Sequence, residues 1–183
     1  MKNRVYVALV HHPVYNKHYE VVTTSITNLD IHDISRTCKT FDVPQFYIVT
    51  NLESQREFLD RILRFWDSEI AQKYNPDRAI ALAMISAKDS IDETVKEIEN
   101  QEGIRPVLIS TTATKYKGAI SFGECKRINR PILFLFGTGN GLTKAVHEYA
   151  DFTLEPIQGI SGYNHLSVRS AVAIVLDRIT SEK

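Results

Sequence analysis

Solid apolar runs separated by helical patterns constrain the fold of this chain more than any other feature. Val5–Val10, Phe46–Val49, Val107–Ser110 and Ile132–Phe136 are almost continuously apolar. Strands of this kind are buried on both faces, which is typical of a parallel sheet covered by helices. Because helical patterns alternate with these runs, the sequence predicts an α/β fold with a parallel sheet and helices on both of its faces.

The helical segments between the strands are recognised by apolar residues that recur every three or four positions. The long helix that includes Leu59 and Ile70 is expected to end at Asn75-Pro76, because the residue before a proline disfavours helix. Ala81–Ile85 is interpreted as a further strand. The predicted helices cover residues 31–41, 59–70, 90–98, 121–128, 142–149 and 168–179.

The 183 residues contain no repeat, low-complexity tract or linker-like stretch. We therefore expect a single domain over residues 1–183. The 22 basic residues equal the 22 acidic ones, so any nucleic-acid surface must be a local patch. The first apolar run is too short to span a membrane or to form a convincing signal peptide, and no membrane role is expected.

The chain has only two cysteines, Cys38 and Cys125. Two cysteines cannot form a disulfide-rich framework or a four-thiolate metal site, and no metal is expected. They are interpreted as small buried side chains in a reducing compartment, which predicts a cytoplasmic location.

A glycine-rich turn follows the most apolar strand. Gly137-Thr138-Gly139-Asn140-Gly141 places three glycines at alternate positions, and a helical pattern resumes at Leu142. Such a turn either lets backbone N–H groups approach a nucleotide-like cofactor or only makes a tight corner. The dinucleotide fingerprint requires glycine where Leu142 stands, and no Walker-type phosphate loop is present, so a dinucleotide-dependent enzyme is a disfavoured alternative.

A second candidate segment runs from Leu154 through the glycine-flanked residues 159–162 to the terminal helix. Asn164, His165 and Ser167 precede that helix and either line a site or only cap it. Because the helix is apolar on more than one side, it needs two partners, the sheet and another subunit.

A third candidate segment holds Asp33 and Arg36, which are three positions apart on one helix face. They form either a surface ion pair or an anion-positioning arginine with a carboxylate that accepts a proton.

Together these segments resemble the three signature regions of the SPOUT class of S-adenosylmethionine-dependent RNA methyltransferases. The first is Asp33-Ile34-Ser35-Arg36-Thr37 through Val43, the second is Ile132–Thr143, and the third is Asn164–Val168. The patterns LDIHDI, FGTGxGL and EPI…YNHLSVRSA are similar to a bacterial subfamily related to the tRNA (guanine-N1)-methyltransferase domain. The resemblance covers nearly the whole chain.

The resemblance implies a deep C-terminal trefoil knot, a homodimer and an S-adenosylmethionine site built from three adjacent turns. Knots are otherwise nearly absent from natural folds. The cofactor-binding residues that it implies are Ser110, Thr111, Thr112, Gly137, Thr138, Gly139, Leu154, Ile157, Asn164, Leu166 and Ser167.

Two positions depart from the ribose-methylating members of the class. This chain has Gly139 where many of them carry glutamate, and His165 where they carry asparagine. We therefore expect methylation of a base in tRNA or rRNA rather than of a ribose 2′-hydroxyl. RNA would be held by local patches at Lys115-Tyr116-Lys117 and at Lys126-Arg127 with Arg130, although solvated surface charge is the alternative.

The expected catalytic residues are Arg36, Asp33, Asp30 and His165. Arg36 would position a phosphate or the acceptor nucleotide, Asp33 or Asp30 would take its proton, and His165 or Tyr163 would line the acceptor pocket. Residues 159–162 would form a mobile lid. The alternative is a non-catalytic knotted dimer that binds S-adenosylmethionine or RNA.

Overall fold

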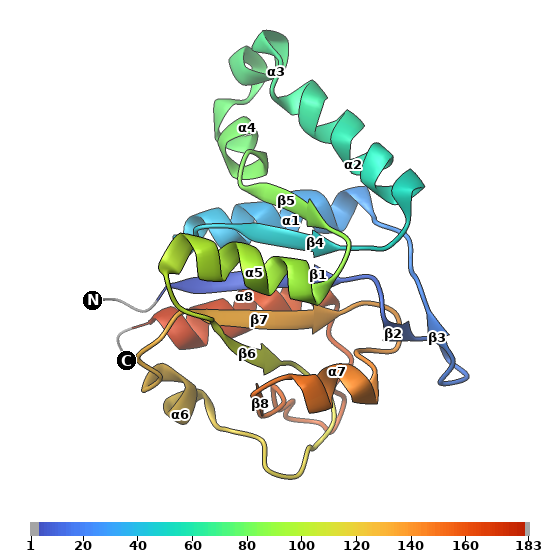
Figure 1. Ribbon diagram of the computed structural model, residues 1–183, viewed down its shortest axis with the longest axis vertical. Helices are drawn as coiled ribbons and strands as arrows, with labels where there is room; N and C mark the ends of the chain where they lie inside the picture. The colour runs from blue at the N-terminus through green and yellow to red at the C-terminus, as the bar shows by residue number, and fades with distance from the viewer. Residues whose placement is uncertain (1–3, 182–183) are drawn as a thin grey trace.

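The computed structural model describes residues 4–181 and contains a six-stranded sheet with the strand order β5-β4-β1-β7-β6-β8 (Figure 1). Every pair of neighbouring strands in this sheet is parallel. A separate antiparallel hairpin pairs β2 with β3. The strands are β1 (Val5–Val10), β2 (Val14–Tyr15), β3 (Val21–Val22), β4 (Phe46–Val49), β5 (Ile85–Lys88), β6 (Val107–Ser110), β7 (Ile132–Gly137) and β8 (Phe152–Thr153).

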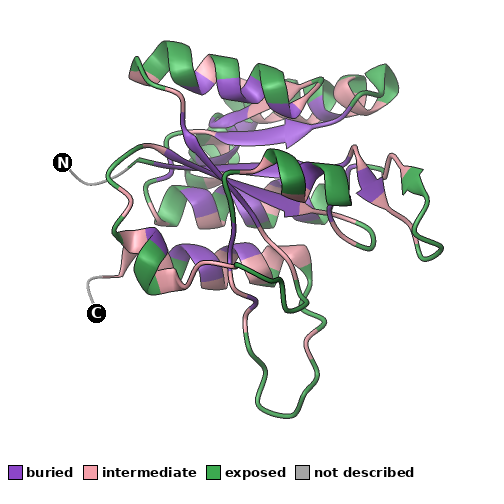
Figure 2. Ribbon diagram, turned by 60° about the horizontal axis from the view of Figure 1, so that its bottom comes forward, coloured by how far each residue is buried: buried purple, intermediate pink, exposed green. Residues whose placement is uncertain are grey.

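Helices cover both faces of the sheet, as the sequence predicted. The helices are α1 (Asn28–Thr40), α2 (Glu53–Trp66), α3 (Glu69–Tyr74), α4 (Pro76–Leu82), α5 (Ile91–Glu102), α6 (Phe122–Lys126), α7 (Lys144–Tyr149) and α8 (Val168–Thr180). Helices α1 and α8 pack on one face, and α5 and α7 on the other (Figure 1). Strand β1 is buried along its whole length because alternate residues enter the two cores. Figure 2 shows this burial along the central strands, with exposed residues on the outer sides of the helices and in the loops.

Three helices, α2, α3 and α4, follow one another between β4 and β5 and extend beyond the β5 edge of the sheet (Figure 1). The prediction of one helix through Ile70 is wrong at its end: α2 stops at Trp66, and Ser68 caps a new helix by accepting from the N–H of Ala71. Asn75-Pro76 ends α3 as expected, but Pro76 also opens α4.

The interpretation of Ala81–Ile85 as a strand is also wrong, because Ala81 and Leu82 complete α4 and β5 begins at Ile85. A short apolar run does not distinguish a buried helix end from a strand. The helix expected from Leu142 begins at Lys144, since Leu142 itself forms a β-bridge with Val14. Within residues 4–181, no helix is long and apolar enough to cross a membrane.

Candidate functional site

The three segments expected to hold the cofactor meet at one edge of the sheet. β7, β6 and β8 are consecutive in the sheet, so their carboxyl ends lie side by side. The Asn164 side chain donates a hydrogen bond of 2.7 Å to the carbonyl of Ala113, which joins the loop before α8 to the turn after β6. In an open parallel sheet, this carboxyl edge is where ligands bind.

At the end of β6, Ser110 belongs to a buried polar cluster. Its hydroxyl lies 2.9 Å from the Thr153 hydroxyl and 2.8 Å from Nδ1 of His147. The sequence interpretation missed His147, which stands on α7 and stacks against Tyr116 at 5.2 Å. Burial lowers the pKa of His147. These contacts fix the turn after β6, and the neutral imidazole of His147 takes part in them.

The next two residues of this turn are also fixed by their hydroxyl groups. Thr111 donates through its hydroxyl to the carbonyl of Leu135, and the Thr112 hydroxyl lies 3.1 Å from that of Thr114. The turn is therefore held to β7 on one side, while its exposed part begins at Ala113 and Thr114.

The glycine turn after β7 is a close-packed corner. A Cβ on Gly139 would lie 2.8 Å from the Tyr15 carbonyl oxygen, and one on Gly137 would lie 2.6 Å from the Leu142 nitrogen. The N–H groups of Thr138 and Asn140 donate to Val10 and Tyr15 respectively, so they are not free for a ligand. Of the two interpretations of this turn, the corner is the one that these contacts support.

The hairpin and the glycine turn are joined by a hydrogen-bonded chain that starts at the end of β1. His11 Nδ1 lies 3.0 Å from the Thr24 hydroxyl, which in turn lies 2.5 Å from the Thr138 hydroxyl. His11 is fully buried, and its Nε2 has no hydrogen-bond partner in the described part of the chain. Burial lowers its pKa to about 4, so the imidazole is neutral near pH 7. The sequence interpretation missed this residue because its partners come from distant segments.

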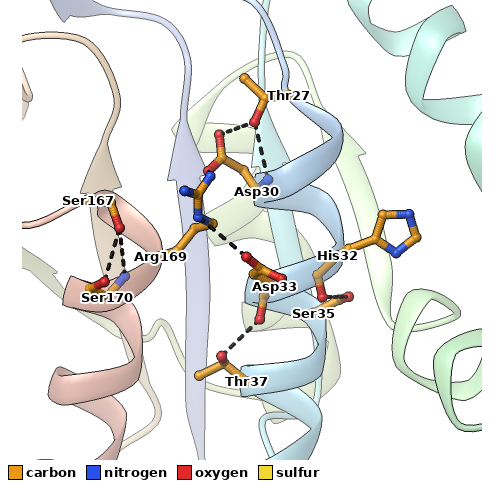
Figure 3. A network of polar contacts seen from close by, with 9 residues as sticks. All are labelled: Thr27, Asp30, His32, Asp33, Ser35, Thr37, Ser167, Arg169 and Ser170. Carbon is orange, nitrogen blue, oxygen red and sulfur yellow. Dashed lines mark hydrogen bonds and ion pairs between the residues drawn. The ribbon is translucent and has the colours of Figure 1, made fainter.

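The two candidate carboxylates on α1 both face Arg169 of α8 (Figure 3). Arg169 lies 3.3 Å from Asp30 and 3.4 Å from Asp33. Asp30 is almost buried and also accepts a hydrogen bond of 2.6 Å from Thr27. Of the two alternatives for Asp33 and Arg36, the surface ion pair between them is therefore wrong: the partner of Asp33 comes from the other end of the chain.

Arg36 lies apart from these carboxylates. It is exposed and lines a depression of about 370 Å³ with Lys39 and Arg78, between α1 and α4. His165 is also exposed and stands edge-to-face with Tyr163 at 5.3 Å. Within residues 4–181, no hydrogen bond or ion pair joins Arg36 or His165 to Asp30 or Asp33. One copy of the chain does not bring the four expected catalytic residues together.

The segment before α8 combines buried and exposed positions. Leu154 is buried and Ile157 packs against the core, whereas Leu166 is 45 % exposed. Ser167 caps α8 by accepting from the N–H of Ser170, so the capping interpretation is confirmed for this residue. Ile160, in the predicted lid, and Tyr163, directly after the lid, have strongly exposed side chains.

The predicted RNA patches differ in how far their side chains are engaged. Lys115 and Lys117 are exposed, and Tyr116 between them is held by His147. Lys126 donates to the carbonyl of Ser181, and Arg130 donates to the carbonyl of Arg105 at 2.6 Å.

The described residues contain no group of three or more His, Cys, Asp or Glu side chains that could hold a metal ion.

A model of a protein family described as SAM-dependent RNA methyltransferases matches residues 4–181. The chain belongs to this family. The match agrees with the SPOUT resemblance, and S-adenosylmethionine is the cofactor of this family.

Two relatives show the same relationship. The chain is 44 % identical over 180 residues to a tRNA (guanine-N(1)-)-methyltransferase of Oleidesulfovibrio alaskensis, a match that covers 97 % of this chain but 42 % of that protein. It is 36 % identical to an uncharacterised protein of Aquifex aeolicus over 99 % of this chain and 90 % of the other. The chain thus spans less than half the length of the methyltransferase that it matches.

Solved structures of low sequence identity share the fold. The SpoU methyltransferase AviRb of Streptomyces viridochromogenes, solved with AdoMet, aligns over 98 % of this chain and 58 % of its own, with a TM-score of 0.61 and 14 % identity. The TrmH/SpoU tRNA modifying enzyme of A. aeolicus aligns over 98 % and 75 %, with a TM-score of 0.58 and 17 % identity. These likenesses confirm the α/β architecture of this methyltransferase class.

Proposed function

We propose that this chain transfers a methyl group from S-adenosylmethionine to a base of tRNA or rRNA. The observation that carries the proposal is the meeting of the turns after β6, β7 and β8 at one edge of the sheet, in a chain of this family. The curated relative named a tRNA (guanine-N(1)-)-methyltransferase supports base methylation, as do Gly139 and His165 in place of the residues typical of ribose methylation.

The residues at this edge fit the cofactor in character. Apolar side chains at Leu154, Ile157 and Leu166 suit the adenine ring, and the small polar residues of the turn after β6 suit the ribose and the methionine part. Bound S-adenosylmethionine would supply an activated methyl group with a neutral leaving group. The protein then has to align the acceptor and, where the acceptor loses a proton, to provide a base.

A second copy of the chain supports the acceptor side of this proposal. Arg36 lies on the β4 side of the sheet, whereas the cofactor turns lie toward β8, so one copy separates them. In a homodimer with a C-terminal knot, as the family resemblance implies, Arg36 of one copy would face the cofactor turns of the other. Asp33, which is half exposed, is then the better proton acceptor, because Asp30 is buried against Arg169 and Thr27. His165 and Tyr163 would line the acceptor pocket.

The cytoplasmic location of the protein stays a prediction.

Calorimetric titration with S-adenosylmethionine tests the cofactor site, with NADH as the control ligand. We expect micromolar binding that Leu166→Asp weakens about tenfold, because a carboxylate would replace an apolar wall. Leu52→Asp is the matched control, since Leu52 is 42 % exposed and lies after β4, outside the proposed site. Absence of S-adenosylmethionine binding to the unmodified protein would sink the proposal.

A non-catalytic binding function is the second candidate. It is favoured by the engagement of both α1 carboxylates with Arg169 and by the internal hydrogen bonds of the glycine turn. Labelled-methyl transfer to total RNA separates the two: cofactor binding without incorporation supports the binding function, and loss of incorporation in Arg36→Ala supports the enzyme.

A further inference from the structure

A cleft of about 530 Å³ lies between α1, α2 and α4, away from the cofactor edge. We call it the α2–α4 cleft, and its wall includes His32, Phe58, Arg61, Phe65, Trp66 and Arg78. Its volume falls within the range of about 300–1,000 Å³ that is typical of small-ligand sites. His32 points into this side of α1, opposite to the carboxylates that face Arg169 (Figure 3).

The wall of the cleft is aromatic. Phe65 and Trp66 stand edge-to-face with their ring centroids 5.5 Å apart, and His32 packs against Trp66 at the same distance. Phe65 is 57 % exposed, so a large apolar ring is left in solvent at the mouth. Exposed aromatic rings of this kind are stacking surfaces for unpaired nucleobases.

The charge of the cleft is positive. Arg61 and Arg78 are part of its wall, and none of the described residues that line it is acidic. Arg78 also lines the adjoining depression with Arg36 and Lys39, where Asp77 is the one carboxylate among the described lining residues. Within residues 4–181, Arg36, Arg61 and Arg78 form no ion pair. Cations without carboxylate partners beside aromatic rings suit an anionic aromatic ligand.

Two polar atoms in the cleft wall have no partner among residues 4–181. Nδ1 of His32 and Nε of Arg78 are buried there without a hydrogen bond, although both side chains flank Trp66. The Arg78 guanidinium carbon lies 5.4 Å from the centre of the Trp66 ring. Buried polar atoms are nearly always hydrogen-bonded in proteins, so the polar groups of this wall are incompletely satisfied.

We propose that the α2–α4 cleft binds an unpaired nucleotide of the RNA substrate, with its base against Phe65 and Trp66 and its phosphates at Arg61 and at Arg36. The inference rests on the proposed function, because it takes RNA as the substrate. A neutral peptide would cover the same rings but would bury the guanidinium groups without anions, which is costly.

The fluorescence of Trp66 tests the cleft directly, because it is the one tryptophan of the chain. We expect hexauridylate, added without S-adenosylmethionine, to quench this emission with an affinity that falls steeply with salt. Arg61→Glu should weaken binding about tenfold. Arg64→Glu makes the same charge change on α2 outside the cleft wall and should leave the affinity within about twofold.

A labelled hexauridylate followed by anisotropy provides a second measurement, in which Trp66→Leu should weaken binding while circular dichroism stays unchanged. RNA binding with silent Trp66 emission, or equal losses in the two arginine variants, would overturn the cleft proposal and leave the proposed function intact. Trp66 emission could instead change on dilution, together with the sedimenting mass, and not respond to RNA. That result would also overturn the cleft proposal and would indicate a contact between copies. Quenching by RNA in a protein that fails to bind S-adenosylmethionine would instead remove the proposed function and keep an RNA-binding cleft.

Discussion

At the residue scale, the buried His11 carries the clearest consequence for stability. It is fully enclosed at the end of β1 and bonds the Thr24 hydroxyl through one ring nitrogen. Desolvation lowers its pKa to about 4, whereas an unfolded histidine titrates near 6.5. Protonation of His11 therefore favours the unfolded state over the folded state.

We expect the free energy of unfolding to fall as the pH drops from about 6.5 toward 4, and to be independent of His11 above that window. The loss from this residue is at most about 3–4 kcal/mol, since one pKa unit corresponds to roughly 1.4 kcal/mol. Urea unfolding between pH 4 and pH 8 measures it. His11→Asn keeps a polar atom near Thr24 and should flatten the profile, and an equally steep profile in this variant would contradict the assignment.

The residue-scale predictions from sequence succeeded where the partner is local. Ser167 was identified as a possible cap because its partner, the N–H of Ser170, is three residues away. The partner of Asp30 could not be found in this way, since Arg169 is 139 positions distant and only the packing of α8 on α1 brings it near. The histidines His11 and His147 were missed for the same reason.

At the scale of elements, Arg169 ties α8 to α1 through its two carboxylate partners. Arg169→Met should lower the free energy of unfolding by about 1–3 kcal/mol, because the nearly buried Asp30 would lose its counter-charge. Asp33→Asn removes only the half-exposed partner and should cost less than about 1 kcal/mol. Chemical denaturation measures both changes in the free energy of unfolding. Equal effects would mean that the buried pair with Asp30 stabilises the fold no more than the half-exposed pair with Asp33.

The glycine turn makes a second prediction at this scale. Gly139 (φ +57°) and Gly103 (φ +71°) both have positive φ, but a Cβ on Gly103 would meet nothing within 4 Å. Gly103→Ala should cost about 1 kcal/mol through backbone strain alone. Gly139→Ala should cost clearly more, because its Cβ would displace the hairpin at Tyr15. Unfolding curves together with proteolysis of the hairpin check the difference, and equal losses would refute the close approach.

Element positions were predictable wherever apolar periodicity was long. The central strands and most of α5 follow from sequence, although α5 continues beyond the predicted end at residue 98 to Glu102. The break between α2 and α3 was hidden, since Ile70 continues the apolar spacing of α2 while the Ser68 cap overrides it. Contacts of the glycine turn with the hairpin were not predictable, because the hairpin is distant in sequence.

At the scale of the whole molecule, the second apolar side of α8 supports the expected dimer. Val172, Val175 and Leu176 are buried, while Ile174 between them stays partly exposed. Sedimentation should give about twice the mass of the 20.8 kDa chain. Ile174→Glu should shift the equilibrium toward the monomer with little change in circular dichroism, and Asp177→Ser on the same helix is the control. A concentration-independent monomer in the unmodified protein would refute the dimer.

The layered architecture could be predicted from sequence because two-sided strand burial leaves a strong pattern. The site could be predicted only as a set of loops, since its contacts depend on strand order, which puts β7, β6 and β8 together. The knot stays a prediction.

Both ends of the described chain lie at the amino edge of the sheet, behind the cofactor turns (Figure 1). Arg4 accepts there from the N–H of Ile132, and Ser181 accepts from Lys126. A longer polypeptide carrying this fold, such as the methyltransferase of which it matches 42 %, can thus append modules at either end without obstructing the ligand edge. The ends of the described chain and the proposed ligand-binding edge therefore lie on opposite sides of the fold.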